Sequence, residues 1–235
     1  MLNLELEKRE VAESVKDYAY RILRKNIIYL NIKPGEAISE NTVALALNIS
    51  RTPVRETFAK LVNDNLLEVY PQKGTYVPLI DMKRVRESVF MRVTMEDAII
   101  KEACTNFPVE YLFLLESNLN QQLFCYSKNK IDKVLELDNE MHELIYQGCG
   151  MENIWSAIKS IGSDQYRVRF LKLATKIRWD ETIEEHRQII QAIKNKDSEA
   201  GYKVMHEHVM KIDNDIEVLI KKYPDYFKKD SLIAK

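Results

Sequence analysis

The sequence predicts a mainly α-helical protein in which a small unit of three helices and a β-hairpin precedes a larger, all-helical bundle. Only 6 Gly and 6 Pro occur among 235 residues, and this scarcity favours long helices over a loop-rich β fold. Strand and turn signals gather between residues 66 and 77, whereas apolar residues recur at helical spacing after Asp81. We therefore expect two domains, at 1–77 and 82–227, joined by a linker at 78–81.

The first domain is expected to contain three helices, each with a stripe of apolar residues. They are placed at 7–31, 40–47 and 51–63. Ser39 precedes the second helix and Ser50 the third, and a serine in this position accepts a hydrogen bond from a free backbone N–H of the first turn. The two serines therefore predict where these helices begin.

A β-hairpin is predicted directly after the third helix. The β-prone runs 66–70 and 75–77 flank the turn sequence Pro71-Gln72-Lys73-Gly74. Three helices followed by a hairpin are typical of a winged helix-turn-helix. The recognition helix of this fold, here the third predicted helix, lies in the major groove of DNA. The first domain is therefore predicted to be an N-terminal winged helix-turn-helix.

The segments after Asp81 all have helical periodicity. Helices are expected at 82–104, 109–128, 131–147, 153–176, 181–195 and 198–222. Asp197 is the expected cap of the last helix, and residues 228–235 are expected to fray. The second domain is thus predicted to be an all-α helical bundle.

Composition excludes several classes of protein. Lys and Arg number 35, Asp and Glu 36, so overall charge cannot drive nucleic-acid binding and a local basic patch must do so. No run of about 18 uncharged apolar residues predicts a membrane span, and the first residues lack the pattern of a signal peptide. The three cysteines have no paired metal-ligand spacing and are expected to be reduced thiols. We expect a cytoplasmic protein.

Two arginines mark one face of the third predicted helix. Arg51 and Arg55 are four residues apart and share this face, whereas Val54 and Phe58 point toward the core. The planar fork of arginine suits guanine O6 and N7 as well as phosphate. By spacing alone, an ordinary short helix with two solvated arginines fits equally well.

The residues of this domain resemble the DNA-binding domain of GntR-family regulators. The resemblance is carried by Pro34-Gly35, Ser39-Glu40, Leu45-Ala46-Leu47, the run Ser50-Arg51-Thr52-Pro53-Val54-Arg55-Glu56, Leu61, Leu66 and Gly74. It implies that Arg51 and Arg55 contact DNA. Supporting contacts are expected from Ser50, Thr52, Lys73 and Gly74. Two positions depart from the family: Asn48 replaces the usual glycine of the turn, and Asn41 replaces an arginine found in some members.

Polar residues interrupt the apolar stripes of three helices predicted in the second domain. Asp138 and His142 lie one turn apart, and His186 and His208 lie in later stripes. Burying such a group without a partner costs about 2–7 kcal/mol, and one divalent metal bound by all four would remove much of that cost. The alternative is four separately satisfied side chains, with Asp138 at the margin of its stripe. His206 is expected to be solvated.

The second domain resembles the effector domain of FadR-type GntR regulators, the all-helical class called FCD. The resemblance is carried by Asp138-x3-His142, Asn153, Glu185-His186, Ile189-Ile190-Gln191-Ala192-Ile193, Asp197, Ala200, Met205 and His208-Val209. Metal-binding members of that class use one Asp and three His. Residue by residue, these correspond to Asp138, His142, His186 and His208. The implied cofactor is a divalent ion, zinc or nickel before manganese.

Arginine residues are the candidates for binding an effector. Arg92 is in phase with the apolar stripe of its helix, and Arg92-x3-Glu96 also resembles the class, whose arginine commonly meets the carboxylate of the effector. The alternative partner of Arg92 is Glu96 itself. Arg169 is a second candidate, and Tyr166 a weaker one.

These observations predict a metabolite-responsive transcription regulator, expected to be a repressor. It would bind a near-palindromic DNA operator as a homodimer and respond to a small organic acid. One alternative keeps DNA binding but makes the metal structural, or itself the signal. Another is a metal-dependent hydrolase, for which no general base is evident because Glu140 and Glu143 point away from the face of Asp138 and His142.

Overall fold

The computed structural model describes residues 2, 4–175, 179–214 and 216–232. The chain forms two compact units, one from the residues before 84 together with those after 219, the other from residues 84–219. The predicted second domain extended to residue 227, whereas the end of the chain packs with the first unit. Two backbone hydrogen bonds join this end of the chain to Ile80, from Ile80 N to Tyr226 O and from Lys228 N to Ile80 O, both 2.9 Å.

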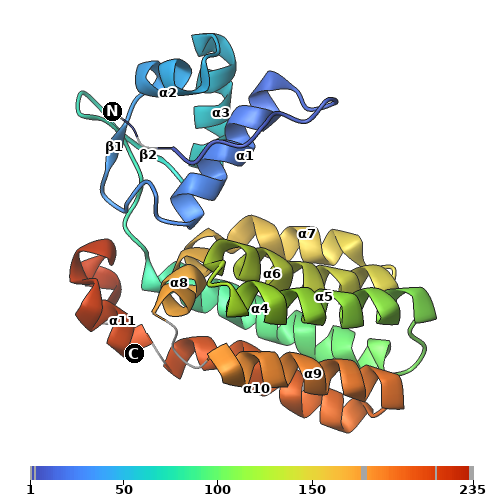
Figure 1. Ribbon diagram of the computed structural model, residues 1–235. Helices are drawn as coiled ribbons and strands as arrows, with labels where there is room; N and C mark the ends of the chain where they lie inside the picture. The colour runs from blue at the N-terminus through green and yellow to red at the C-terminus, as the bar shows by residue number, and fades with distance from the viewer. Residues whose placement is uncertain (1, 3, 176–178, 215, 233–235) are drawn as a thin grey trace. The chain divides into compact units, whose positions relative to one another are not determined.

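Three helices of the first unit surround its apolar core (Figure 1). They are α1 (Val15–Ile28), α2 (Glu40–Leu47) and α3 (Arg51–Asn63). Helix α1 begins at Val15, directly after its cap Ser14 and eight residues later than predicted. The other two begin where the sequence predicted, because Ser39 forms a capping box with Thr42 ahead of α2. Ser50 occupies the cap position of α3 but makes no side-chain cap hydrogen bond, which corrects that prediction.

A small antiparallel sheet completes the first unit. It contains β1 (Ala37–Ile38), β2 (Glu68–Tyr70) and β3 (Gly74–Tyr76) in the order β1-β3-β2. The hairpin of β2 and β3 was predicted, whereas the two residues of β1 were not. At the hairpin turn, Gln72 and Gly74 have φ values of 62° and 118°, and the second value is readily reached only by glycine.

The turn between α2 and α3 has the geometry that Asn48 allows. Asn48 adopts the left-handed conformation, with φ 53° and ψ 48°, and so terminates α2 at the position where the resemblance to GntR regulators implies a glycine. Asparagine reaches this conformation more easily than most other residues. Asn48 therefore allows the turn between α2 and α3 to form without a glycine.

The second unit is built from α4 to α10 and the start of α11 (Figure 1). The bounds are α4 Met82–Ala103, α5 Val109–Ser127, α6 Ile131–Gly148, α7 Glu152–Ile161, α8 Ser163–Ala174, α9 Trp179–Asn195, α10 Ser198–Asn214 and α11 Ile216–Lys222. Helix α5 packs on α6 and α9, and α9 packs on α10. Asp197 caps α10 as predicted, accepting a hydrogen bond from Ala200 N at 3.0 Å.

Two further predictions, one for residues 153–176 and one for the residues after 228, differ from the structure. The helix expected at 153–176 is two helices, α7 and α8, which meet at Gly162, where ψ is 7°. A Cβ atom added at Gly162 would lie 3.0 Å from the ring of Tyr166, so glycine permits this junction. The expected fraying after 228 is also wrong in part, because Lys229–Leu232 form a 3-10 helix. Residues 176–178 and 233–235 lie outside the described residues.

No helix in the described part of the chain combines the length and the apolar character needed to cross a bilayer.

Candidate metal centre and DNA-binding surface

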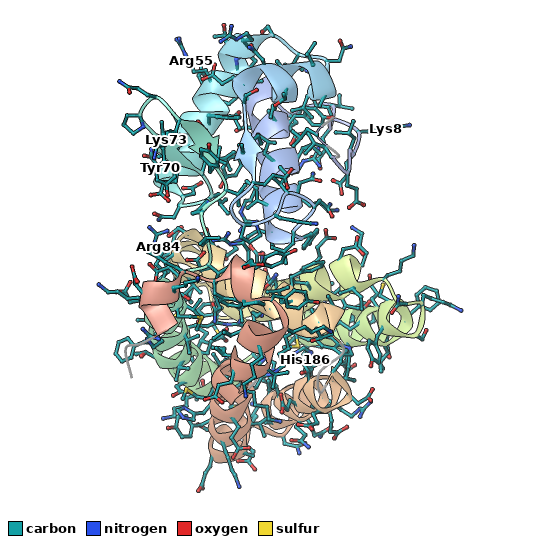
Figure 2. The ribbon with its side chains drawn as sticks, turned by 90° about the vertical axis from the view of Figure 1, so that its left-hand side faces the viewer. Lys8, Arg55, Tyr70, Lys73, Arg84 and His186 are labelled. Atoms are coloured by element: carbon teal, nitrogen blue, oxygen red, sulfur yellow. The ribbon has the colours of Figure 1, made fainter. Side chains whose placement is uncertain are left out.

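Helix α3 presents its predicted DNA-binding side chains to solvent. Ser50, Arg51, Thr52 and Arg55 are all exposed, whereas Val54 is fully buried on the opposite face. In Figure 2, the side chains of Arg55 and of Lys73, on the hairpin turn, both project from the first unit. The exposed arginines are therefore held on a short helix that is anchored by its apolar face.

One ion pair restrains the DNA-binding surface. Arg51 Nη2 lies 3.5 Å from Glu40 Oε2, and the side chain of Arg51 is 67% exposed. An exposed pair of this kind contributes about 0–1 kcal/mol. The pair with Glu40 can therefore give way when a phosphate or a base edge approaches Arg51.

The four predicted metal ligands come together inside the second unit. Asp138 and His142 project from α6, His186 from α9 and His208 from α10. One candidate ligand atom from each side chain lies within 4.8 Å of the others. His142 Nε2 is 3.2 Å from His208 Nε2, and His186 Nε2 is 3.4 Å from Asp138 Oδ1.

The cluster is shielded from water. The side chains of His142 and His186 are fully buried, and those of Asp138 and His208 are 4% and 7% exposed. Burial lowers the pKa of all three imidazoles below the ordinary value of 6.5, and neighbouring histidines lower the pKa of His186 and His208 further. Neutral imidazoles carry the lone pair that a metal ion requires, so the protonation state fits metal binding.

Arg92 makes the ion pair that was the alternative to effector binding. Its Nε donates to Glu96 Oε1 at 3.2 Å, and both residues are buried. Glu96 Oε1 also lies 2.8 Å from His142 Nδ1, although off the axis needed for a hydrogen bond, so that nitrogen has no hydrogen-bond partner. Arg92 Nη2 likewise has none. The guanidinium is therefore only partly satisfied by Glu96.

Arg169 contacts a candidate metal ligand directly. It forms an ion pair with Asp138 and donates from Nη1 to Asn139 Oδ1 at 2.6 Å. Its guanidinium carbon lies 5.7 Å from the ring centre of Tyr166, which is buried. The structure thus places Arg169 beside the cluster, where it holds the carboxylate of Asp138.

A cavity of about 40 Å³ adjoins the cluster. Its lining includes Arg92, Asp138, Arg169, Lys172, Trp179 and His208. Three of these side chains are cationic, and Trp179 Nε1 is buried without a hydrogen-bond partner. The cavity therefore suits a small anionic group.

His206 lies apart from the cluster, as expected for a residue two positions from His208. Its side chain is 40% exposed, and its Nδ1 lies 2.8 Å from Asp97 Oδ2. The expectation of a solvated histidine was right about its exposure but missed this partner.

Sequence reasoning overlooked the residues that contact the outer nitrogens of the histidines. Glu96 lies beside His142, Gln122 beside His186 and Glu185 beside His208. A signal was available for Gln122, because it and Asn118 are polar residues one turn apart within an otherwise buried stripe of α5.

Comparisons with known proteins agree with this architecture. Residues 16–77 match the family of bacterial regulatory proteins, gntR family, and residues 87–211 match the FCD domain. The HTH-type transcriptional repressor RspR of Escherichia coli (strain K12) is 30% identical over 218 residues, which cover 93% of this chain and 96% of that protein. The gluconate operon transcriptional repressor of Bacillus subtilis (strain 168) is 25% identical, with 84% and 83% covered.

The fold also recurs in a solved structure. E. coli McbR/YncC superposes with a TM-score of 0.76 at 22% identity, covering 90% of this chain and 99% of that one. The helix-turn-helix, the helical second unit and these relatives lead to the same conclusion. The chain belongs to the GntR family of bacterial regulatory proteins and contains an FCD domain, so it is a DNA-binding transcription regulator and not an enzyme.

Proposed function

We propose that this protein is a metabolite-responsive repressor of the FadR subfamily, acting in the cytoplasm as a homodimer. The observation that carries the proposal is the convergence of four buried donor side chains within 4.8 Å, beside a cavity whose lining includes three cationic side chains. In this account the cluster holds a divalent metal, and the cavity holds a small organic acid that changes the affinity for the operator.

The proposed metal ligands are Asp138, His142, His186 and His208. One carboxylate and three neutral imidazoles suit zinc or nickel, with manganese also compatible. When bound, the ion would supply a Lewis acid that takes a carboxylate oxygen of the effector. His186 Nε2 supports the assignment, because it is buried without a hydrogen-bond partner only 3.4 Å from Asp138 Oδ1.

The proposed effector is a small carboxylate. Arg92 is 2% exposed and its Nη2 has no partner, so an anionic oxygen would satisfy a donor that is otherwise left buried. Arg169 and Lys172 add positive charge to the same cavity. The name of the Bacillus subtilis relative refers to a gluconate operon, and gluconate is a hydroxycarboxylate. That name supports the ligand class without identifying the ligand.

The proposed DNA contacts are made by α3 and the hairpin turn. Arg51 and Arg55 would reach base edges or phosphates, and a homodimer would place two such helices on the halves of a near-palindromic operator. Supporting contacts would come from Ser50, Thr52, Lys73 and Gly74. Repression is proposed because the Escherichia coli and Bacillus subtilis relatives are both named as repressors.

An effector can control DNA binding only if it binds the DNA-competent and DNA-incompetent states with unequal affinity. A regulator whose metal is structural, or itself the signal, would need no cationic cavity beside the ion. The Nη2 atom of Arg92, which Glu96 leaves without a hydrogen-bond partner, therefore favours an organic anion in this cavity.

The test is a thermal-shift screen of small mono-, di- and hydroxycarboxylates against zinc-loaded protein, repeated after chelation. A ligand at 100 times its Kd adds about 2.7 kcal/mol to the free energy of unfolding. We expect a stabilising carboxylate whose effect disappears on chelation and in His142→Ala but persists in His206→Ala, the matched control. A screen without hits, together with a large loss of stability on chelation, would favour a structural metal.

A further inference from the structure

A chain of hydrogen bonds on α5 determines which nitrogen of His186 carries the proton. Asn118 Nδ2 donates to the backbone carbonyl of Leu137 at 3.1 Å, and this contact orients the amide because a carbonyl only accepts. Asn118 Oδ1 then accepts from Gln122 Nε2 at 2.8 Å. Gln122 Oε1 is consequently left to face His186 Nδ1, also at 2.8 Å.

The amide oxygen of Gln122 accepts only, so His186 Nδ1 must donate. A neutral imidazole has a single N–H, and with it on Nδ1 the Nε2 atom presents a bare lone pair. That lone pair lies 3.4 Å from Asp138 Oδ1, so two electron-rich atoms face each other without a proton between them. Such an arrangement is satisfied by a cation shared between the two atoms.

His208 is held in the same way by a carboxylate. Its Nδ1 lies 2.9 Å from Glu185 Oε2, and Glu185 is in turn ion-paired with Lys211. Because an ionised carboxylate only accepts, the proton of His208 lies on Nδ1, and Nε2 is free toward the cluster. His142 is less constrained, since its contact with Glu96 is off-axis and its Nε2 also lies 3.2 Å from His208 Nε2.

We infer that Gln122 and Glu185 are positioning residues of the proposed metal centre, each accepting the Nδ1–H of one histidine and leaving the Nε2 atoms of His186 and His208 as metal ligands. Partners of this kind orient the ring, fix the tautomer and strengthen the ligand. This inference rests on the proposed function, because it gives the outer contacts a role only if the cluster binds a metal.

The two positioning residues lie on different helices. Gln122 lies on α5, which contributes no candidate ligand, whereas Glu185 lies on α9 next to His186. Gln122 is fully buried and Glu185 is 8% exposed. Glu185 is ion-paired with Lys211, and Gln122 is uncharged. Neither residue therefore adds an unpaired charge to the cluster.

The first experiment measures zinc affinity by competition with a chromophoric chelator. Gln122→Met and Glu185→Met remove the acceptor and nearly preserve the volume, and each is expected to lower zinc affinity 10- to 100-fold. The exposed neighbours provide matched controls, Gln121→Met and Glu184→Met, which should leave affinity unchanged. Glu185→Gln restores an accepting oxygen and should recover most of the loss.

The second experiment reads the tautomers directly from ¹⁵N NMR of the histidine rings in zinc-free, full-length protein. We expect the Nδ1–H form for His186 and His208 in the wild type, and a shift toward Nε2–H for His186 in Gln122→Met. Nε2–H rings in the wild type would overturn the inference even if a variant fails to fold. So would unchanged zinc affinity in both Met variants.

The two proposals can fail separately. If the wild-type protein does not bind zinc, nickel or manganese, the proposed metal centre fails whatever the tautomers are. If it binds zinc tightly but Gln122→Met and Glu185→Met bind equally well, the metal centre stands and the role of these two residues is refuted.

Discussion

The buried histidines make a strong prediction about acid stability. Burial lowers the pKa of His142, His186 and His208 in the folded protein, whereas in the unfolded chain each titrates near 6.5. Below that pH the unfolded chain binds more protons than the folded one, so acid favours unfolding. Without metal, stability should therefore be retained above about pH 6.5 and decline as the pH falls.

The magnitude follows from the number of protons taken up. One proton changes the free energy of unfolding by about 1.4 kcal/mol per pH unit, so three histidines give a limiting slope of about 4 kcal/mol per pH unit. Within two pH units, a decline of this steepness would remove much of the free energy of unfolding, which is about 5–15 kcal/mol in a typical folded protein.

The assay is urea unfolding of chelator-treated protein at pH 7.5, 6.5, 5.5 and 5.0. We expect little change between the first two values and a steep decline below. His186→Leu should lower the slope by about 1.4 kcal/mol per pH unit. A flat profile from pH 7.5 to 5.0, or equal slopes in the wild type and His186→Leu, would refute the account of neutral buried imidazoles.

Three further predictions concern DNA binding by α3, effector binding by Arg92 and the role of the hairpin turn. Arg55→Ala should weaken binding to an operator selected from random duplexes by roughly 5- to 150-fold in a fluorescence-anisotropy titration, while Lys60→Ala on the same helix should not. Arg92→Gln should bind zinc within a few-fold of the wild type in a chelator competition but lose the thermal shift caused by carboxylates, and a retained shift would exclude Arg92 from the effector site. Gly74→Val should weaken operator binding because φ is 118° there, and normal affinity would count against a role for the hairpin turn in DNA binding.

Local signals explain why much of the first unit could be predicted. Ser50 and Pro53 mark the start of α3, and the helix spans residues 51–63 as expected. The hairpin followed from its β-prone runs and Gly74. The two residues of β1 are too few for any period to be read, and their pairing with β3 depends on the folded chain.

Helical periodicity also placed the candidate metal ligands on buried faces. Asp138 and His142 share a face of α6 because they are one turn apart, and the structure brings them together with His186 and His208. Periodicity could not identify Gln122 or Glu96 as neighbours of these rings, because the contacts depend on how helices register against one another. The break at Gly162 was missed because the residues on both sides continue a helical pattern.

The central claim, a metal bound by the four clustered side chains, is tested most directly by isothermal titration of zinc into chelator-stripped protein. The account predicts one high-affinity ion per chain, with binding lost in His142→Ala and kept in His206→Ala. Absence of binding in the wild type, or equal binding by His142→Ala, would contradict it.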